Sequence, residues 1–327
     1  LPNRSGIGGV FVNRSATGSD AAAGDSNQTY ALDGRWGLGR YGQVSGFAAG
    51  TSSAEPRRAE RAFRLATSYD SPTWRLNATY TDVGEGFNPE VGFVRRDDMS
   101  QYSGEVTWSP QLRRSDTIRN FNVGASVDYF EGGTGAIETR TQEATLGVQF
   151  ENNGSVNLTV NETFDRLVTP FAIRPTISLS AGDYRYRRVS ASANNGSRRK
   201  IGASGNVSWG DFWSGESTSF GGSLDIRPNY HLNADLSYSR NRVVLPEGSF
   251  TTQLVGARVL YGFSPRLFLN AFLQYNADTR QVSSNIRFNF THHPLSDIYV
   301  VWNETRLPTE TRRAEAASNV PGKYVCA

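Results

Sequence analysis

Apolar and polar residues alternate with a period of two along most of this chain, in segments of about ten residues. One such segment places polar or small residues between Phe121, Val123, Ala125, Val127 and Tyr129. Successive strand side chains point to opposite faces, so each segment has one apolar and one polar face. A tilted membrane strand needs roughly 9–11 residues, whereas strands in soluble sheets average about five or six. The pattern predicts an all-β, transmembrane, antiparallel up-and-down β-barrel with about 16–18 strands, which could be part of a larger barrel.

The composition agrees with a barrel whose interior is wet. Apolar residues make up only 37% of the chain and the mean hydropathy is −0.48, yet aromatic residues reach 12%. A soluble domain of this size needs more apolar residues for its core, whereas a wide barrel needs only an apolar outer face. No segment approaches the roughly 18 consecutive apolar residues of a transmembrane helix. We therefore expect the bacterial outer membrane, with its lipid as a partner.

Connection lengths predict the orientation of the strands. Outer-membrane barrels have short periplasmic turns and longer outside loops. Short links are expected at Gly39–Arg40, Asp70–Pro72, Asn152–Gly154, Arg227–Asn229 and Ser264–Pro265. Longer links are expected between them, at Ala16–Ser26, Ser52–Glu60, Gly84–Ser100, Arg166–Asp183 and Val243–Ser249. On this assignment the first strand, near Gly6–Val12, runs outward.

Aromatic residues recur at the expected strand ends. The short turns are flanked by Trp36, Tyr41, Tyr69 and Trp74, and the opposite ends carry Tyr80, Tyr129, Tyr238 and Tyr275. Rings of this kind gather at the two membrane–water interfaces of a barrel. The repetition predicts two aromatic girdles.

The segment Gly84–Arg96 is the strongest candidate for a ligand-binding loop, because long ordered loops on a rigid scaffold often carry function. Its candidate contacts are Phe87, Asn88, Pro89, Phe93, Arg95 and Arg96. The two arginines could face a carboxylate or a phosphate, since the guanidinium fork fits planar anions. Alternatively, Pro89, Gly92 and the two phenylalanines only anchor the loop to the rim of the barrel.

Charged residues on the polar side of the strands are candidates for lining the lumen. They are Asp33, Arg35, Arg64, Arg75, Asp128, Glu143 and Arg287. A charge on the lipid face costs about 2–4 kcal/mol at the midplane, so we expect these residues to face inward. They could line a solute path or brace the wall through ion pairs.

Catalytic, cofactor and metal sites find little support. The three histidines are His231, His292 and His293, and the last two precede Pro294 at a predicted short turn. His231 and Asp235 would lie about 13 Å apart on one strand. We therefore expect no enzyme, no cofactor and no metal. The 34 basic and 31 acidic residues are spread along the strands, which argues against nucleic acid as a partner.

Three stretches resemble a bacterial outer-membrane barrel family of unknown function whose members carry an N-terminal domain like the carbohydrate-binding family 9 modules. The stretches are Arg4–Arg14, Phe87–Arg96 and His293–Tyr299 leading into Trp302-Asn303-Glu304. The resemblance implies that this domain and some strands would precede Leu1. We expect residues 1–305 to form the barrel and 306–327 to form a polar tail or a final strand.

Three functions remain open from the sequence. The first is a pore, or the membrane component of a system that handles a small solute, with carbohydrate or another glycan implied by the resemblance alone. The second is a docking barrel that binds a protein partner through loops Gly84–Ser100 and Arg166–Asp183. The third is a barrel-embedded hydrolase that uses His231 or His292.

Overall fold

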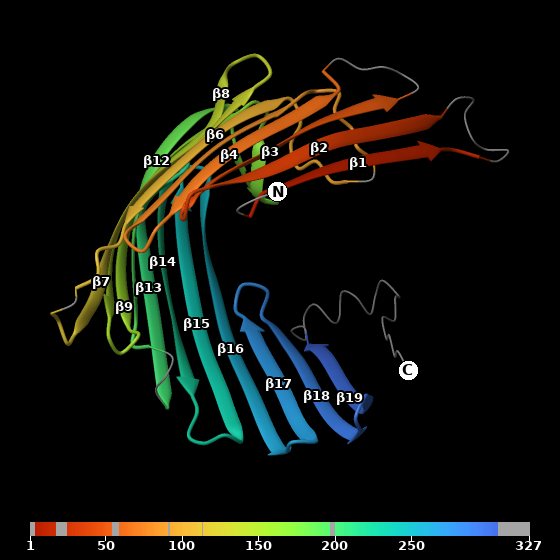
Figure 1. The fold of residues 1–327 in the computed structure, drawn as a ribbon. Helices are drawn as coiled ribbons and strands as arrows, with labels where there is room; N and C mark the ends of the chain where they lie inside the picture. The colour runs from red at the N-terminus through yellow and green to blue at the C-terminus, as the bar shows by residue number, and fades with distance from the viewer. Residues whose placement is uncertain are drawn as a thin grey trace, which may run out of the picture. The chain divides into compact units, whose positions relative to one another are not determined.

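The computed structural model describes residues 4–17, 25–53, 59–90, 92–112, 114–196 and 200–306. The regular structure within these ranges is nineteen β-strands, of which seventeen form one antiparallel sheet and two, β10 and β11, form a separate hairpin (Figure 1). The chain divides into two compact units, Leu1–Gln149 with Asn157–Val189 (unit 1) and Phe150–Val156 with Ser190–Ala327 (unit 2). The predicted tail begins at Arg306, the last residue of β19, and otherwise lies outside the described residues.

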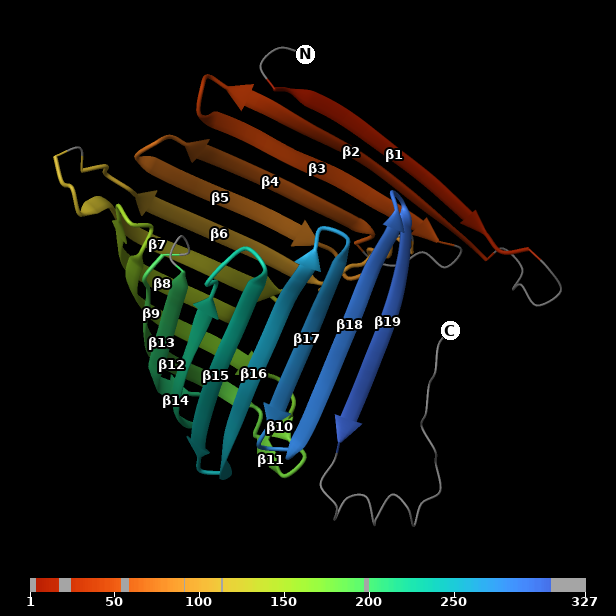
Figure 2. The same cartoon turned by 90° about the horizontal axis from the view of Figure 1, so that it is seen from below.

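Unit 1 contains most of the first twelve strands; the end of β8, the start of β9 and the end of β12 belong to unit 2. These first twelve strands are β1 (Gly6–Ser15), β2 (Ser26–Leu38), β3 (Gly42–Ser53), β4 (Arg61–Asp70), β5 (Trp74–Val83), β6 (Met99–Trp108), β7 (Ile118–Gly132), β8 (Ile137–Phe150), β9 (Ser155–Leu167), β10 (Phe171–Arg174), β11 (Ile177–Leu179) and β12 (Gly182–Asn194). Within unit 1, the strands from β1 to β7 each pair antiparallel with the next one along the chain, and Figure 2 shows β2 to β6 side by side.

Unit 2 repeats this simple order. Its strands are β13 (Ile201–Phe212), β14 (Gly215–Ile226), β15 (Leu232–Leu245), β16 (Gly248–Ser264), β17 (Leu267–Asn276), β18 (Gln281–His293) and β19 (Ser296–Arg306). Each pairs antiparallel with its successor, from β13 to β19. Most strands in both units have ten or more residues, as a membrane-spanning strand requires.

Cross-strand pairs define a polar face in unit 1. Asp33 of β2 pairs with Phe47 of β3, Phe47 with Arg64 of β4, Arg64 with Thr81 of β5, and Thr81 with Gln101 of β6. Paired residues project from the same face of a sheet, and neighbours along a strand project from opposite faces. The face that carries Asp33 is called the polar face of unit 1.

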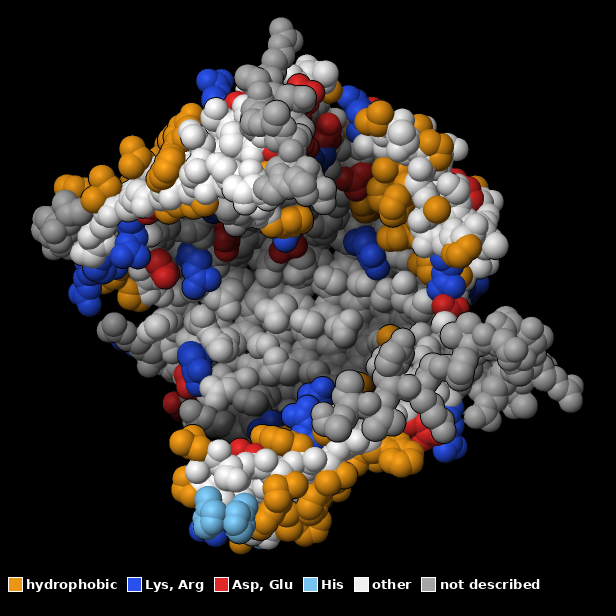
Figure 3. All heavy atoms as spheres, turned by 90° about the vertical axis from the view of Figure 1, so that its right-hand side faces the viewer, with side chains coloured by type: hydrophobic (Ala, Val, Ile, Leu, Met, Phe, Trp, Pro, Cys, Tyr) orange, Lys and Arg blue, Asp and Glu red, His pale blue; other side chains and the backbone are white. Residues whose placement is uncertain are grey.

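Among the residues that the structure describes, no protein layer covers the opposite, apolar face of unit 1. Leu32 is 69% exposed, Leu65 48% and Leu158 41%. Hydrophobic side chains at this exposure are expected where lipid completes the packing. Figure 3 shows both kinds of surface: hydrophobic side chains (orange) gather on one side of the strands, and charged ones (blue and red) gather mainly on the other.

Aromatic rings lie at both ends of the strands of unit 1, as the sequence predicts. At the end of the longer links, Tyr80 contacts Tyr102 with ring centroids 5.0 Å apart, and Tyr102 contacts Tyr129 at 6.0 Å. These rings lie on β5, β6 and β7. The short-turn end carries two further pairs, Tyr41 with Tyr69 at 5.9 Å and Trp74 with Trp108 at 6.3 Å.

Unit 2 has its own polar face. Arg258 of β16 pairs with Asp235 of β15 and Phe272 of β17, and the Arg258 guanidinium lies 5.3 Å from the centre of the Phe272 ring. Asn270, two residues from Phe272 on the same strand, pairs with Arg287 of β18. Arg287 therefore shares a face with Arg258 and Asp235.

The predicted alternation of link lengths is wrong in unit 2. The expected loop Val243–Ser249 is a two-residue turn at 246–247, because β15 continues to Leu245 and β16 begins at Gly248. Val243 is 1% exposed and Leu245 is 6% exposed, so burial of apolar side chains extends the strand. The β13–β14 link, at residues 213–214, is equally short.

The predicted strand number and antiparallel order are confirmed, but the sheet is not closed in this structure. In any sheet whose consecutive strands are all antiparallel, an odd number of strands leaves the first and last strands running in the same direction. Closing such a sheet into a barrel would pair the first strand with the last one in parallel. An even number of strands avoids this parallel pair. Among the residues that the structure describes, no helix is long and apolar enough to cross a membrane.

Candidate functional site

The link between β5 and β6, residues 84–98, is held against the strands of unit 1. At its start, the Gly84 backbone N–H donates to the Arg61 carbonyl oxygen at 2.9 Å. A Cβ atom at Gly84 would lie 1.9 Å from the Ala59 carbonyl oxygen, so only glycine fits this close approach. The loop therefore leaves β5 in a direction that its first residue fixes.

The middle of the loop covers polar side chains of β2 and β3. The Asn27 side-chain amide donates to the Asn88 carbonyl oxygen at 2.9 Å, and the Asn88 backbone N–H donates to Thr51 Oγ1 at 3.2 Å. Asn27 is 2% exposed and Thr51 3%, although both belong to the polar face of the sheet. Their burial shows that the loop folds over this face.

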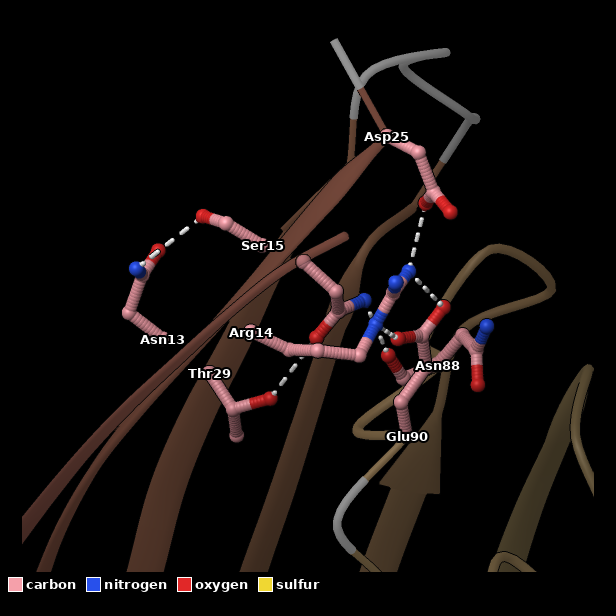
Figure 4. A network of polar contacts seen from close by, with 8 residues as sticks. Asn13, Arg14, Ser15, Asp25, Thr29, Asn88 and Glu90 are labelled. Atoms are coloured by element: carbon pink, nitrogen blue, oxygen red, sulfur yellow. Dashed lines mark hydrogen bonds and ion pairs between the residues drawn. The ribbon is translucent and has the colours of Figure 1, made fainter. Parts of the chain in front are cut away.

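Arg14 of β1 forms a charged anchor for the same part of the loop (Figure 4). Its Nη2 donates to Asp25 Oδ1 at 2.6 Å and to Glu90 Oε1 at 3.1 Å, and its Nε makes an ion pair with the second oxygen of Glu90. The hydrogen bond from Arg14 holds the pKa of the Asp25 carboxyl below its ordinary value. Asp25, just before β2, thus remains ionised and helps to orient the guanidinium toward Glu90.

The end of the loop is tied to a different part of unit 1. Arg96 makes an ion pair with Glu138, near the start of β8, and its guanidinium lies 5.3 Å from the centre of the Phe130 ring of β7. Phe130 pairs with Gln101 and so belongs to the polar face. The loop is therefore fixed at both ends, to β1–β3 on one side and to β7–β8 on the other.

The predicted contact residues divide into anchors and exposed groups. Asn88 and Arg96 are anchors, while Phe87 and Pro89 are half-buried, and a turn in which the Gly92 N–H donates to the Pro89 carbonyl oxygen follows. Phe93 is 89% exposed, so it anchors nothing here. Arg95 is also exposed and makes no ion pair with a described residue. Of the predicted contact residues, Phe93 and Arg95 are thus exposed without an anchoring role, and contact of any of the six with a ligand stays a prediction.

Sequence reasoning did not single out Arg14, Asp25, Asn27, Glu90 or Glu138. One signal was available, because Arg14 and Glu90 belong to two of the stretches on which the family resemblance rests. The structure brings these two stretches together through the Arg14–Glu90 ion pair.

The charged residues predicted to line a lumen lie on the polar faces. Asp33 and Arg64 are linked by the cross-strand pairs described above, Arg75 lies 3.6 Å from Asp70, and Asp128 accepts a hydrogen bond from Gln101 at 2.8 Å. Arg35, two residues from Asp33 on the same strand, donates to the Arg4 carbonyl oxygen at 3.1 Å. Arg287 lies on the polar face of unit 2, and Glu143 lines the hollow described next.

The polar face of unit 1 contains a hollow of about 360 Å³ between β6, β7 and β8. It is lined by Glu105, Thr107, Asn122, Gly124, Ala125, Ser126, Glu143 and Thr145. Asn77 donates to Glu105 at 3.0 Å, and the hydroxyls of Thr145 and Thr159 share a hydrogen bond at 3.2 Å. Such a surface of carboxylates, amides and hydroxyls is stable only against water or a polar solute.

The histidines are arranged as turn residues. His231 Nδ1 lies 2.6 Å from the Gly262 carbonyl oxygen, across the β15–β16 pair. The rings of His292 and His293 contact each other at 4.1 Å at the end of β18. Within the described part of the chain, no group of three or more His, Cys, Asp and Glu side chains could hold a metal ion.

We expect the Arg14 anchor to control the mobility of the loop. Glu90→Gln removes a charge-assisted pair, so proteolytic cleavage within residues 84–98 should become several-fold faster, since cleavage follows the population of the open loop. Limited proteolysis followed by mass spectrometry measures the rate. Glu85→Gln, in the same loop, is the matched control and should leave the rate unchanged; equal effects of the two changes would contradict the anchor.

The long antiparallel strands with one apolar and one polar face place the chain in the fold class of outer-membrane β-barrels. No family model and no curated protein sequence matches the chain. Two solved mutants of the ferric enterobactin receptor (PfeA) from Pseudomonas aeruginosa match it with TM-scores of 0.52 and 10% sequence identity. In the first, the match covers 91% of this chain and 62% of the receptor, so the chain spans less than two thirds of the receptor's length.

A further match is to OmpF from Salmonella typhi in complex with daunomycin. It has a TM-score of 0.42 and 9% identity, and it covers 83% of this chain and 88% of the porin. At these identities the receptor structures show the fold alone. The resemblance to the family with carbohydrate-binding domains stays a prediction.

Proposed function

We propose that this protein is a bacterial outer-membrane barrel whose polar face lines a water-filled path for small polar solutes. The observation that carries the proposal is the loop of residues 84–98, which folds over the polar face of unit 1 and is tied to both β1–β3 and β7–β8. A loop that is anchored on both sides narrows the path to a constant width, because it cannot swing across the path and block it. Selectivity then depends on the groups that line the constriction.

The chemistry of the wall favours an uncharged or zwitterionic solute. The predicted lining residues on the polar face of unit 1 carry both signs of charge: Arg35, Arg64 and Arg75 are basic, and Asp33, Asp128 and Glu143 are acidic. The electrostatic potentials of positive and negative side chains largely cancel at a distance, so the wall attracts neither cations nor anions strongly. Amides and hydroxyls around the hollow at Glu105 and Glu143 suit the hydroxyl groups of a sugar. Carbohydrate is accordingly the first solute class to test.

Swelling of protein-loaded vesicles in sugar solutions tests the proposal. Monosaccharides and disaccharides should enter at rates that rise with the amount of protein, and rates should fall with solute size. Vesicles loaded with heat-denatured protein are the control. Swelling no faster than in the control, from a correctly folded preparation, would exclude passive diffusion of sugars.

One observation keeps a docking function as the second candidate. Phe93 is 89% exposed and Val168 is 78% exposed, and they lie in the two links that the sequence predicts as binding loops. An exposed apolar side chain is removed from water when a partner protein covers it, which favours binding. We infer that Phe93→Ser with Val168→Ser would abolish co-purification of such a partner; unchanged co-purification would remove this candidate.

A further inference from the structure

A cluster of arginines stands on the apolar face of unit 1. Along β9, Leu158 and Val160 are exposed, and Asn161 lies on the opposite, polar face. Glu162 and Arg166 project from the same face as Leu158 and Val160, because even-numbered residues of this strand share one face. Charged side chains therefore replace hydrophobic ones on the same surface near the end of β9.

Two arginines of β12 converge on Glu162. Its Oε1 accepts from Arg185 Nη2 at 2.6 Å and its Oε2 accepts from Arg187 Nη2 at 2.9 Å. The Glu162 side chain is only 15% exposed, whereas the side chains of Arg185 and Arg187 are 65% and 64% exposed. The carboxylate thus lies beneath two guanidinium groups and holds them side by side at the surface.

Neighbouring contacts extend the cluster. Arg166 makes a bidentate ion pair with Asp183, in which Nε and Nη2 donate to the two carboxylate oxygens at 2.7 and 2.8 Å. Arg140 Nη2 of β8 lies 4.0 Å from Glu162 Oε1. Within this group, four arginines surround two acids. We call these six residues, Arg140, Glu162, Arg166, Asp183, Arg185 and Arg187, the arginine cluster.

The position of the arginine cluster matches a membrane–water boundary. Arg166 precedes the last residue of β9, and Asp183 follows the first residue of β12. The cluster is thus at the end of the strands that leads into the link of residues 168–181. A charge at the midplane of a lipid-facing surface is costly, whereas one near the interface costs little. The cluster can therefore remain ionised where lipid headgroups begin.

We propose that the arginine cluster binds the phosphate groups of an anionic lipid headgroup. The planar guanidinium fork donates two parallel hydrogen bonds to a phosphate, and Glu162 pre-orients two such forks. The hydrophobic residues on the same face, Leu158 and Val160, lie where acyl chains would follow a bound headgroup. The inference rests on the membrane placement in the proposed function but not on conduction of solutes.

A binding measurement with the full chain in a neutral detergent tests this inference. The probe is a glycolipid that carries phosphate monoesters on a glucosamine disaccharide, titrated into the protein and followed by intrinsic fluorescence or native mass spectrometry. A zwitterionic phospholipid and inorganic phosphate are the comparison probes. The wild-type protein should bind the phosphorylated glycolipid saturably and at least about tenfold more tightly than either comparison probe.

The double change Arg185→Gln with Arg187→Gln should weaken glycolipid binding by about tenfold or more. Arg35→Gln with Arg64→Gln removes the same charge from the polar face and should leave binding unchanged. Circular dichroism checks that each variant is folded, and Arg185→Lys with Arg187→Lys keeps the charge if the glutamine variant does not fold. This lysine variant should bind more weakly than the wild type, because it lacks the planar fork.

Three results would overturn the inference: no binding by the wild type, equal loss in the two glutamine variants, or binding of inorganic phosphate as tight as that of the glycolipid. The last result would assign the cluster to a free anion. The outcome is separable from that of the proposed function. A barrel that excludes sugars but binds the glycolipid leaves this inference standing, and a barrel that admits sugars but does not bind the glycolipid overturns this inference alone.

Discussion

Replacing residues 86–97 with a short Gly-Ser linker is expected to raise the single-channel conductance by about a factor of two or more, because the narrowest part of a pore dominates its resistance. The reason is structural: Asn88, Glu90 and Arg96 hold this segment across the polar face of unit 1. Without it, the buried side chains of Asn27 and Thr51 would become part of the wet wall. Planar-bilayer recordings of purified wild-type and variant protein provide the measurement.

The control keeps the loop and its anchors. Phe93→Ala with Arg95→Gln changes the two exposed residues and leaves the contacts of Asn88, Glu90 and Arg96 in place. Its conductance should stay close to that of the wild type, although solute preference could change. A linker variant that is folded but conducts like the wild type would show that the loop does not constrict the path.

An arginine on the apolar face of β9 should be strongly destabilising. Leu158→Arg places a charge among exposed hydrophobic residues of the strand, four residues from Glu162, so the free energy of unfolding in lipid vesicles should fall by about 2–4 kcal/mol. Val160 is 37% exposed, and its neighbour Leu158 on the same face is 41% exposed. Urea unfolding followed by tryptophan fluorescence in vesicles measures the change.

Thr159→Arg is the matched control for this prediction. Thr159 follows Leu158 directly and faces the opposite way, where Asn and Thr side chains form the polar surface. An arginine there meets water, so the free energy of unfolding should change by less than about 1 kcal/mol. If both substitutions cost the same, the assignment of the two faces would be wrong.

Much of the fold could be predicted because alternation is a local property of each strand. The pattern of Leu158, Thr159, Val160 and Asn161 specifies both the strand and its two faces, and the structure confirms it in β9. Aromatic strand ends such as Tyr80 and Tyr129 were found in the same way. The sequence was misleading at Val243–Ser249, where Pro and Gly indicate a loop but buried Val243 and Leu245 extend the strands.

The candidate site could be predicted only in part because its contacts are long-range. The loop of residues 84–98 stood out by its composition, yet its partners Arg14 and Glu138 are far from it in sequence. The pairing of Arg185 and Arg187 with Glu162 depends on the register between β9 and β12, which single-sequence patterns do not give. Residues on one strand can be assigned to a face, but the neighbours across strands come from the structure.

The central claim is that the polar face of the strands meets water and the apolar face meets lipid. Single cysteines at Leu158, Thr159, Val160 and Asn161, in a Cys326→Ser background, test it directly after reconstitution into vesicles or nanodiscs. A membrane-impermeant thiol reagent should label the cysteines at positions 159 and 161 and leave those at 158 and 160 unlabelled until detergent is added. Equal labelling at all four positions in lipid would contradict the account, because it would mean that neither face of β9 is covered by the membrane.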